Sequence, residues 1–356
     1  MSSTNAISTS LVSLADKAEW DSYVAAHPQA TAYHKFAWQQ AVNHAYKHAI
    51  YGVIAKQENT GNIVGVLPCV LIKTPLIGKR LCSLPYCDVG HALADSNDIA
   101  LQLQQCLTQQ LSETGSKALE MRAVQAAPVD TSQLSHQKVR MLLPLPNTSE
   151  ALMAGFKSKL RSQIRKAEKN GLTVSLGTEQ PLINDFYTVY TKNMRDLGSP
   201  VHSKKWFEQI VNTYAESCIL SVVYKDNTPI GGGLVIKNTS SASIPWASTL
   251  RDYNKLAPNM LLYWSLLGHC ADSGIKTFDF GRSTYEEGTY KFKKQWGAKP
   301  QLLNWQKFDQ HGELIKEQLA ATSPGKMRPI AENMWQKLPL TFTVAVGSAI
   351  RPHISL

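Results

Sequence analysis

Two hydrophobic periods, one typical of helices and one of strands, follow each other in the same order twice along the chain. Positions 34–42 and 202–211 have helical spacing. After each comes a pair of strand-like runs around a polar turn: 50–56 and 63–72 around the turn at 58–62, and 219–225 and 230–237 around the turn at 226–229. A longer helical run then ends at a glycine, and a short strand follows it.

Matched landmarks indicate that one α/β unit occurs twice. Three residue pairs lie 168, 166 and 160 positions apart: Trp38 and Trp206, Gly65 and Gly231, Arg122 and Arg282. The order helix, hairpin, helix, strand predicts an α/β (α+β) fold in which each unit is a mixed sheet flanked by helices. A chance similarity between two α/β patterns is the alternative.

The length and composition suit two domains. The chain has 356 residues, of which 43% are hydrophobic and 18% charged, enough to bury two cores. Proline, asparagine, threonine and serine cluster at 144–149, which predicts a boundary there. We expect a first domain at 1–150, a second at 151–318 and a tail at 319–356, where the periodic pattern loosens.

Net charge and cysteine usage limit which classes of binding partner and which cellular location are expected. The 37 basic and 27 acidic residues give a net charge of +10, which favours anionic partners without choosing among them. The first twenty residues lack the apolar core of a signal peptide, and no apolar run reaches membrane-spanning length, so we expect a cytoplasmic protein. The six cysteines form no C-x-x-C pair and are interpreted as buried thiols. No metal site is expected, since His44 and His48 lack a third ligand.

A strongly basic helix is predicted at 157–170. One stripe of this segment is apolar, and most of its remaining positions are lysine or arginine. Arg161 and Arg165 lie four residues apart, so both guanidinium groups would project from one helix face toward phosphate oxygens. A solvated basic face is the alternative interpretation.

The second candidate region, 279–298, is a strand that continues into a polar loop and then a basic, aromatic segment. If this segment is extended, Lys291 and Lys293 share one face, and Phe292 points the other way into the core. The triplet Asp279-Phe280-Gly281 does not indicate a kinase, because no glycine-rich loop or H-R-D motif accompanies it.

The third candidate region combines Trp246 and Asn259 with an apolar helix at 260–267, which is interpreted mainly as core. The run 231–233 of three glycines predicts a bulge or a close backbone approach.

Two basic motifs resemble those of the FemAB family. The segment 159–171, KLRSQIRKAEKNG, is similar to the family's K-x-R-x-x-I-R-K-A-E-K-x-G helix, and 288–297, GTYKFKKQWG, is similar to its Y-x-F-K-x-x-F/W-G segment. The segments 196–200, DLGSP, and 279–283, DFGRS, resemble the subgroup associated with exosortase and PEP-CTERM systems. In the first half, 65–68 and 84–86 fit the same family.

The resemblance implies two tandem GNAT-like domains, the second of the BioF2-like acetyltransferase type. It also implies transfer of an activated acyl or aminoacyl group to an amine on a cell-envelope glycan precursor, either peptidoglycan or exopolysaccharide. The donor would be acyl-CoA or aminoacyl-tRNA, with no tightly bound cofactor, and the acceptor an anionic glycan or nucleotide-sugar precursor. Two departures leave the donor open: no coiled-coil arm and no GNAT pyrophosphate loop are recognisable.

We therefore assign roles as hypotheses. By resemblance, Lys293 after Phe292 lies at the acyl-transfer centre, where its charge would stabilise the developing oxyanion. The remaining candidates would bind substrate or phosphate: Arg161, Arg165, Arg282, Tyr285, Tyr290, Lys291, Trp246 and Asn259. Asp279 and Glu286 are candidate general bases. The alternative function is a non-catalytic glycan- or membrane-surface adaptor whose tail at 335–354 contacts the inner membrane; nonspecific RNA binding ranks last.

Overall fold

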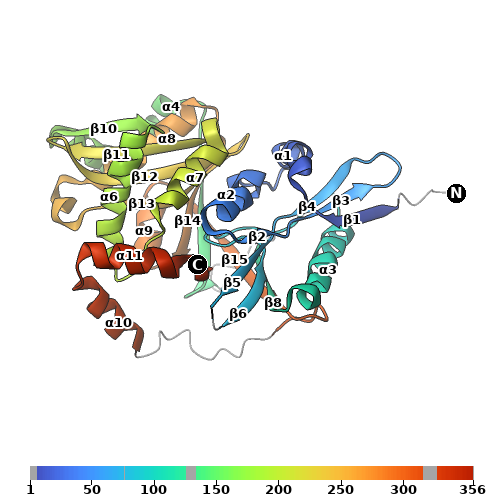
Figure 1. Cartoon of the computed structure of the whole chain (residues 1–356). Helices are drawn as coiled ribbons and strands as arrows, with labels where there is room; N and C mark the ends of the chain where they lie inside the picture. The colour runs from blue at the N-terminus through green and yellow to red at the C-terminus, as the bar shows by residue number, and fades with distance from the viewer. Residues whose placement is uncertain (1–5, 76, 126–133, 316–326, 356) are drawn as a thin grey trace. The chain divides into compact units, whose positions relative to one another are not determined.

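The computed structural model describes residues 6–75, 77–125, 134–315 and 327–355 (Figure 1). The chain forms two compact units. Unit 1 comprises residues 1–139, 301–317 and 353–356, and unit 2 comprises 140–300 and 318–352. Residues 301–317 belong to unit 1 because the strand β15 (Lys299–Phe308) pairs antiparallel with a strand of that unit, Leu303 opposite Val124 through Phe308 opposite Leu119.

Unit 1 carries its strands in two groups. One follows the order β1-β3-β4-β7 and the other β15-β8-β6-β5-β2. Their bounds, with those of the helices, are β1 (Ile7–Leu11), α1 (Lys17–Ala26), α2 (Phe36–Tyr46), β2 (Ala49–Ile50), β3 (Val53–Gln57), β4 (Ile63–Leu67), β5 (Val70–Thr74), β6 (Gly78–Cys82), β7 (Leu93–Ala94), α3 (Asn97–Thr114) and β8 (Ser116–Val124).

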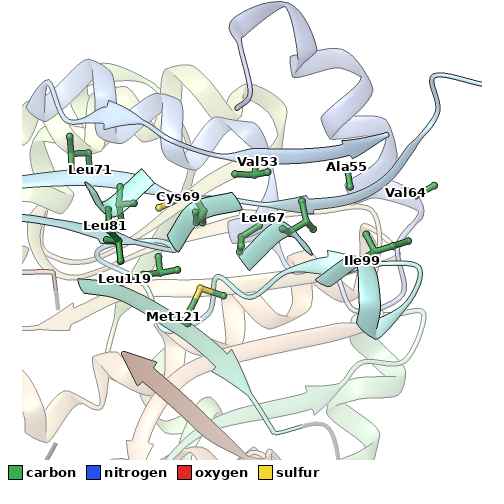
Figure 2. Packing of buried hydrophobic residues seen from close by; sticks show 13 residues of the cluster. Val53, Ala55, Val64, Leu67, Cys69, Leu71, Leu81, Ile99, Leu119 and Met121 are labelled. Atoms are coloured by element: carbon green, nitrogen blue, oxygen red, sulfur yellow. The ribbon is translucent and has the colours of Figure 1, made fainter. Parts of the chain in front are cut away.

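One core cluster of unit 1 lies between α3 and these strands, and a second contains Trp20 of α1 and Phe36 of α2. Figure 2 shows Val53, Leu67, Leu81 and Leu119 converging with Ile99 of α3. The apolar run predicted as one strand at 63–72 is in fact two strands in different sheets, because it is interrupted at 68–69, where proline provides no N–H for a ladder. The predicted helix and hairpin of the first copy are otherwise confirmed by α2, β3 and β4.

Unit 2 also contains the order helix, hairpin, helix, strand, here with one run of strands, β10-β11-β12-β13-β14-β9. Its bounds are β9 (Lys138–Pro144), α4 (Ser149–Gly155), α5 (Ser158–Lys169), β10 (Leu172–Gly177), α6 (Gln180–Asp196), α7 (Lys204–Tyr214), β11 (Cys218–Lys225), β12 (Thr228–Lys237), β13 (Ser241–Thr249), α8 (Pro258–Asp272), β14 (Thr277–Thr284) and α9 (Gly288–Gln295). The mixed α/β fold class is thereby confirmed, and the basic helix predicted at 157–170 is α5.

Two of the three glycines of β12, Gly232 and Gly233, allow helices to approach both faces of the strand. A Cβ at Gly232 would lie 3.0 Å from the Phe186 ring of α6, and one at Gly233 would lie 3.1 Å from Leu266 of α8. Figure 1 shows α6 and α8 on opposite sides of these strands. The close backbone approach predicted from the sequence is confirmed.

The part of the predicted tail that the structure describes is not loose. Residues 327–336 form α10 (Met327–Gln336) and 340–350 form α11 (Leu340–Ile350), and both pack against α6. Pro329 lies in the first turn of α10 and Pro339 is the N-cap of α11, positions at which a missing N–H costs nothing. In the described residues, no helix is both long and apolar enough to cross a bilayer.

Candidate active site

Two neighbouring parallel strands of unit 2 separate after a short pairing. β13 and β14 pair only from Ser241 opposite Thr277 to Ser243 opposite Asp279. Beyond that point β13 continues over 244–249 and β14 over 280–284, with Gly281 in the left-handed region at φ +72°. Ligands of α/β sheets commonly bind at the carboxyl ends of strands, which makes the end of β14 the first place to look for chemistry.

Lys293 reaches this strand end from α9. Its Nζ atom donates to the carbonyl oxygens of Arg282 at 2.7 Å and Gly281 at 3.0 Å, and only 7% of the residue is exposed. The prediction that this segment is extended is wrong, because 288–295 is helical. Tyr290, Lys293 and Trp296 recur every three residues and are all buried, a helical period that the flanking glycines obscured.

The helix also changes which neighbours Lys293 has. Lys291 and Lys294 are exposed, and Lys291 does not share a face with Lys293 as an extended segment would require. Phe292 is half-buried, with its ring 5.1 Å from that of Tyr263 in α8. It therefore contacts α8 but is only half-buried, whereas the sequence predicted a side chain that points into the core from an extended segment.

A buried ion pair fixes the bend of β14. Asp279 Oδ2 lies 3.7 Å from Arg140 Nη1, and Asp279 Oδ1 accepts a hydrogen bond of 2.8 Å from the backbone N–H of Gly281. Both charged side chains are at least nine-tenths buried. The contacts make Asp279 a positioning residue for the carbonyl that binds Lys293; the other candidate base, Glu286, is exposed.

Two buried hydroxyl groups at these strands were missed by sequence reasoning. The Oγ atoms of Ser243 in β13 and Ser283 in β14 are buried and have no hydrogen-bond partner among the described residues. An unsatisfied buried hydroxyl is costly unless a ligand or water completes it. Ser243 lies in no motif, and the motif 279–283 that contains Ser283 does not separate its hydroxyl from its neighbours, so only the unpaired oxygen identifies these positions.

Arg161 and Arg165 line one pocket, as their spacing predicted. It has a volume of about 540 Å3 and is formed by Ser149, Glu150, Met153, Ala154, Arg161, Arg165 and Trp264. Arg161 Nη1 donates to the carbonyl oxygens of Phe156 at 2.9 Å and Ala154 at 3.2 Å, so this side chain also holds the end of α4. Arg165 is exposed. Trp264, predicted as core, is half-buried and forms a wall of the pocket.

Aromatic contacts connect this pocket with α9. The ring of Trp264 lies 6.2 Å from that of Phe156, which lies 5.5 Å from Trp296. Trp296 in turn lies 6.4 Å from Phe292, the neighbour of Lys293. The basic pocket and the buried lysine therefore belong to one packed cluster within unit 2. In such a cluster, a shift of the side chains at the pocket displaces the side chains that hold α9.

The remaining predicted residues are dispersed. The ring centroids of Tyr285 and Tyr290 lie 4.7 Å apart, and the hydrogen bond between the two side chains raises the pKa of Tyr285. Trp246 instead packs on α7, with its ring 5.1 Å from that of Phe207. Asn259 Oδ1 accepts a hydrogen bond from Thr249 Oγ1 at 3.1 Å and does not cap α8. Arg282 is half-buried, and its backbone oxygen contacts Lys293.

The matching arginine of unit 1 has a different environment from Arg282. Arg122 is buried, donates to the carbonyl oxygens of Cys87 and Ser355, and lies 4.9 Å from the Trp305 ring centroid. A pocket of about 540 Å3 adjoins it. Within the described residues, no cluster of three or more histidine, cysteine or acidic side chains could hold a metal ion.

Comparisons with known proteins agree with this architecture. The family model for an acetyltransferase (GNAT) domain matches residues 154–294. The structure is similar to the crystal structure of FemX, with a TM-score of 0.64, 14% identity, and coverage of 83% of this chain and 95% of FemX. It is also similar to a tandem GNAT protein from the clavulanic acid biosynthesis pathway, with a TM-score of 0.52, 12% identity, and coverage of 86% and 99%.

A third similar structure is the C-terminal domain of a putative lysylphosphatidylglycerol synthetase from Agrobacterium fabrum. The TM-score is 0.52 at 12% identity, and the match covers 81% of this chain and 90% of that domain. No curated protein sequence matches the chain. Residues 154–294 of unit 2 thus match the GNAT acetyltransferase domain, and the chain has the mixed α/β fold of tandem GNAT-like proteins such as FemX.

Proposed function

We propose that the chain is an N-acyltransferase of the FemAB type, which moves an activated acyl or aminoacyl group to an amine of a cell-envelope glycan precursor. The observation that carries the proposal is the buried ammonium of Lys293 at the end of β14, in a unit that matches a GNAT acetyltransferase domain. The donor is acyl-CoA or aminoacyl-tRNA, and the acceptor an amine on peptidoglycan or exopolysaccharide precursors, alternatives that rest on the sequence resemblance.

The chemistry needs few groups from the protein. A neutral amine attacks the thioester or ester carbonyl, the carbon–nitrogen bond forms, and the tetrahedral oxyanion collapses with loss of the thiolate or alkoxide. The amine's proton passes to a base or to the leaving group. A fixed cation near the oxyanion lowers this barrier. Lys293 is held by two carbonyl dipoles at a fixed place, and the hydroxyl of Ser283, on the same strand, is a donor without a partner among the described residues.

The basic pocket supplies a place for the anionic part of a substrate. Arg165 is exposed at its rim and Trp264 forms an apolar wall. A guanidinium beside an indole suits a phosphate attached to a ring. Because the pocket is packed against Phe156 and Trp296, it belongs to the same cluster as α9.

The test is a donor-by-acceptor transfer assay. Purified protein is incubated with labelled acetyl-CoA, longer acyl-CoA or charged tRNA, each with amine-bearing nucleotide sugars or lipid-free peptidoglycan precursors, and products are identified by mass. An acyl-acceptor adduct that needs both substrates supports the proposal. Absence of transfer with every donor, together with tight binding of a glycan precursor, would favour the adaptor.

The second candidate, a non-catalytic glycan adaptor, draws on one observation. Both carbonyl contacts of Lys293 are internal to unit 2 and would serve equally to fix α9 on β14. In that case a charge-removing substitution would destabilise the unit without any loss specific to turnover. The two roles thus differ in a measurable way.

A further inference from the structure

The helix α11 is unusual for a helix on a surface. From 338 to 350 the sequence contains no charged residue, and the run is bordered by Lys337 and Arg351. A helix packed on a domain normally turns charged or polar residues to solvent, whereas a helix that is apolar all round is covered on all sides. In the described structure only one side of α11 is covered.

The covered side is fixed by a close contact with the segment after α6. A Cβ at Gly347 would lie 2.8 Å from the backbone nitrogen of Val201, and Thr343, one turn earlier, is also buried. α10 approaches the same segment, because a Cβ at Gly198 would lie 2.7 Å from that of Glu332. These contacts determine which side chains of the two helices face outward.

Most of the exposed residues of α11 are apolar, and Thr341 is its exposed polar residue. Phe342 is 49% exposed and Ile350 43% exposed on α11, and exposed Ala345 and Ala349 lie on the same face as Phe342. On α10, Ile330 and Met334 are one turn apart and 56% and 66% exposed. Leu197, 53% exposed, adjoins Gly198, where α10 packs. We call Leu197, Ile330, Met334, Phe342 and Ile350 the tail patch.

Charge at the edge of the tail patch indicates what covers it. Lys337 is exposed between the helices, Arg351 follows α11, and Lys192 is exposed on α6, against which both helices pack. A second copy pairing along α11 would bring a basic helix end against a basic helix end in either direction, which is repulsive. An apolar helix bordered by cations instead complements a surface with an apolar interior and anionic headgroups.

We propose that the tail patch docks unit 2 on an anionic lipid surface, with α11 lying in the plane of the headgroups. The helix has 11 residues, too short to span a bilayer, so the contact is peripheral. The inference does not depend on the proposed reaction, since an enzyme or an adaptor would use the same surface. It assigns a role to two helices that the acyl-transfer site does not use.

The test is sedimentation of the full chain with phosphatidylcholine vesicles, with and without phosphatidylglycerol, at low and high salt. The wild-type chain is expected to bind the anionic vesicles and to be released by salt. Met334→Glu with Phe342→Glu should lower the apparent affinity about tenfold or more, because two apolar side chains no longer enter the interface. Lys337→Glu should also weaken binding to anionic vesicles.

The matched control is Leu101→Glu with Leu176→Glu. These leucines are 56% and 42% exposed and lie outside the tail patch, so the control makes the same change of charge on similarly exposed positions. Its vesicle binding should exceed that of the tail-patch variant. The proposal is overturned if the wild-type chain does not bind anionic vesicles, if both double variants bind alike, or if the tail-patch variant abolishes a wild-type dimer in solution while vesicle binding is absent.

Discussion

The Nζ atom of Lys293 lies 2.7 Å from the backbone carbonyl oxygen of Arg282, and the same ammonium also binds the carbonyl of Gly281. A side chain of α9 thus closes the end of β14, where the backbone turns at a glycine. Hydrogen bonds from a charged donor contribute more than neutral ones, and the carbonyl oxygens would lose a buried partner if the ammonium were removed.

Lys293→Met should therefore lower stability as well as activity. We expect a loss of about 1.5–3 kcal/mol in the free energy of unfolding, measured by urea titration. Lys294→Met, on the exposed side of the same helix, should change stability by about 0.5 kcal/mol or less. Equal stability of the two variants and the wild-type chain would mean that the carbonyl contacts are not important for folding.

Gly281→Ala should disturb the same strand end through the backbone. Gly281 has φ +72°, and an L residue in that region costs about 1–2 kcal/mol. Its N–H is also the donor to Asp279, so a shift would move the carbonyl that holds Lys293. Thermal melts of Gly281→Ala and the control Gly155→Ala, where a Cβ meets open space, provide the comparison. A Gly281→Ala chain as stable as the control would contradict a required left-handed conformation.

The two pocket arginines should separate binding from stability. Arg165→Ala should weaken the binding of a phosphate-bearing ligand, such as CoA or a nucleotide sugar, by about 1.5 kcal/mol, which is roughly tenfold in Kd. The melting temperature should stay unchanged. Arg161→Ala should lower both the ligand affinity and the melting temperature, because Arg161 also donates hydrogen bonds to the carbonyls of Ala154 and Phe156. Lys169→Ala, on α5 outside the pocket, is the control for calorimetric titrations. If Arg165→Ala and Lys169→Ala bind equally, the pocket is only a solvated basic face.

The buried histidine of unit 2 should make stability depend on pH. Burial, and then the charge of Arg351, hold the pKa of His202 well below 6.5. Below pH 6.5 the unfolded chain therefore binds a proton that the folded chain does not, and stability falls by up to about 1.4 kcal/mol per pH unit until the folded pKa is reached.

Urea titrations from pH 8 to pH 5 measure this effect. His202→Phe should flatten the dependence, whereas His311→Phe, at an exposed position, should leave it unchanged. An identical slope in the wild-type and His202→Phe chains would assign the acid sensitivity to other groups.

Much of unit 2 could be predicted because its signals are local. The hairpin of β11 and β12, the basic helix α5 and the glycine approach in β12 follow from periodicity, turn residues and missing Cβ atoms. The helical state of α9 was missed because glycines at both ends resemble a loop, although Tyr290, Lys293 and Trp296 already show the period.

The features that could not be predicted are long-range. Nothing near Lys299–Phe308 indicates that this strand pairs with β8 of unit 1, since pairing partners depend on the whole sheet. Arg140 and Ser243 lie in no recognisable motif, and the DFGRS motif that contains Ser283 does not show that its hydroxyl is unpaired; only the bent end of β14 gives the three residues a place in the candidate site. Chemistry alone groups Trp246 with Tyr285, whereas the fold assigns Trp246 to the cluster around α7.

The central claim is that Lys293 stabilises charge in an acyl-transfer reaction. The direct measurement is kcat and KM of Lys293→Met, per mole of folded protein, with the donor and acceptor identified by the transfer assay. We predict a fall in kcat of about 10²- to 10³-fold with KM little changed, because the interaction strengthens in the transition state. A folded Lys293→Met chain with wild-type kcat would contradict the claim and leave Lys293 as a structural link between α9 and β14.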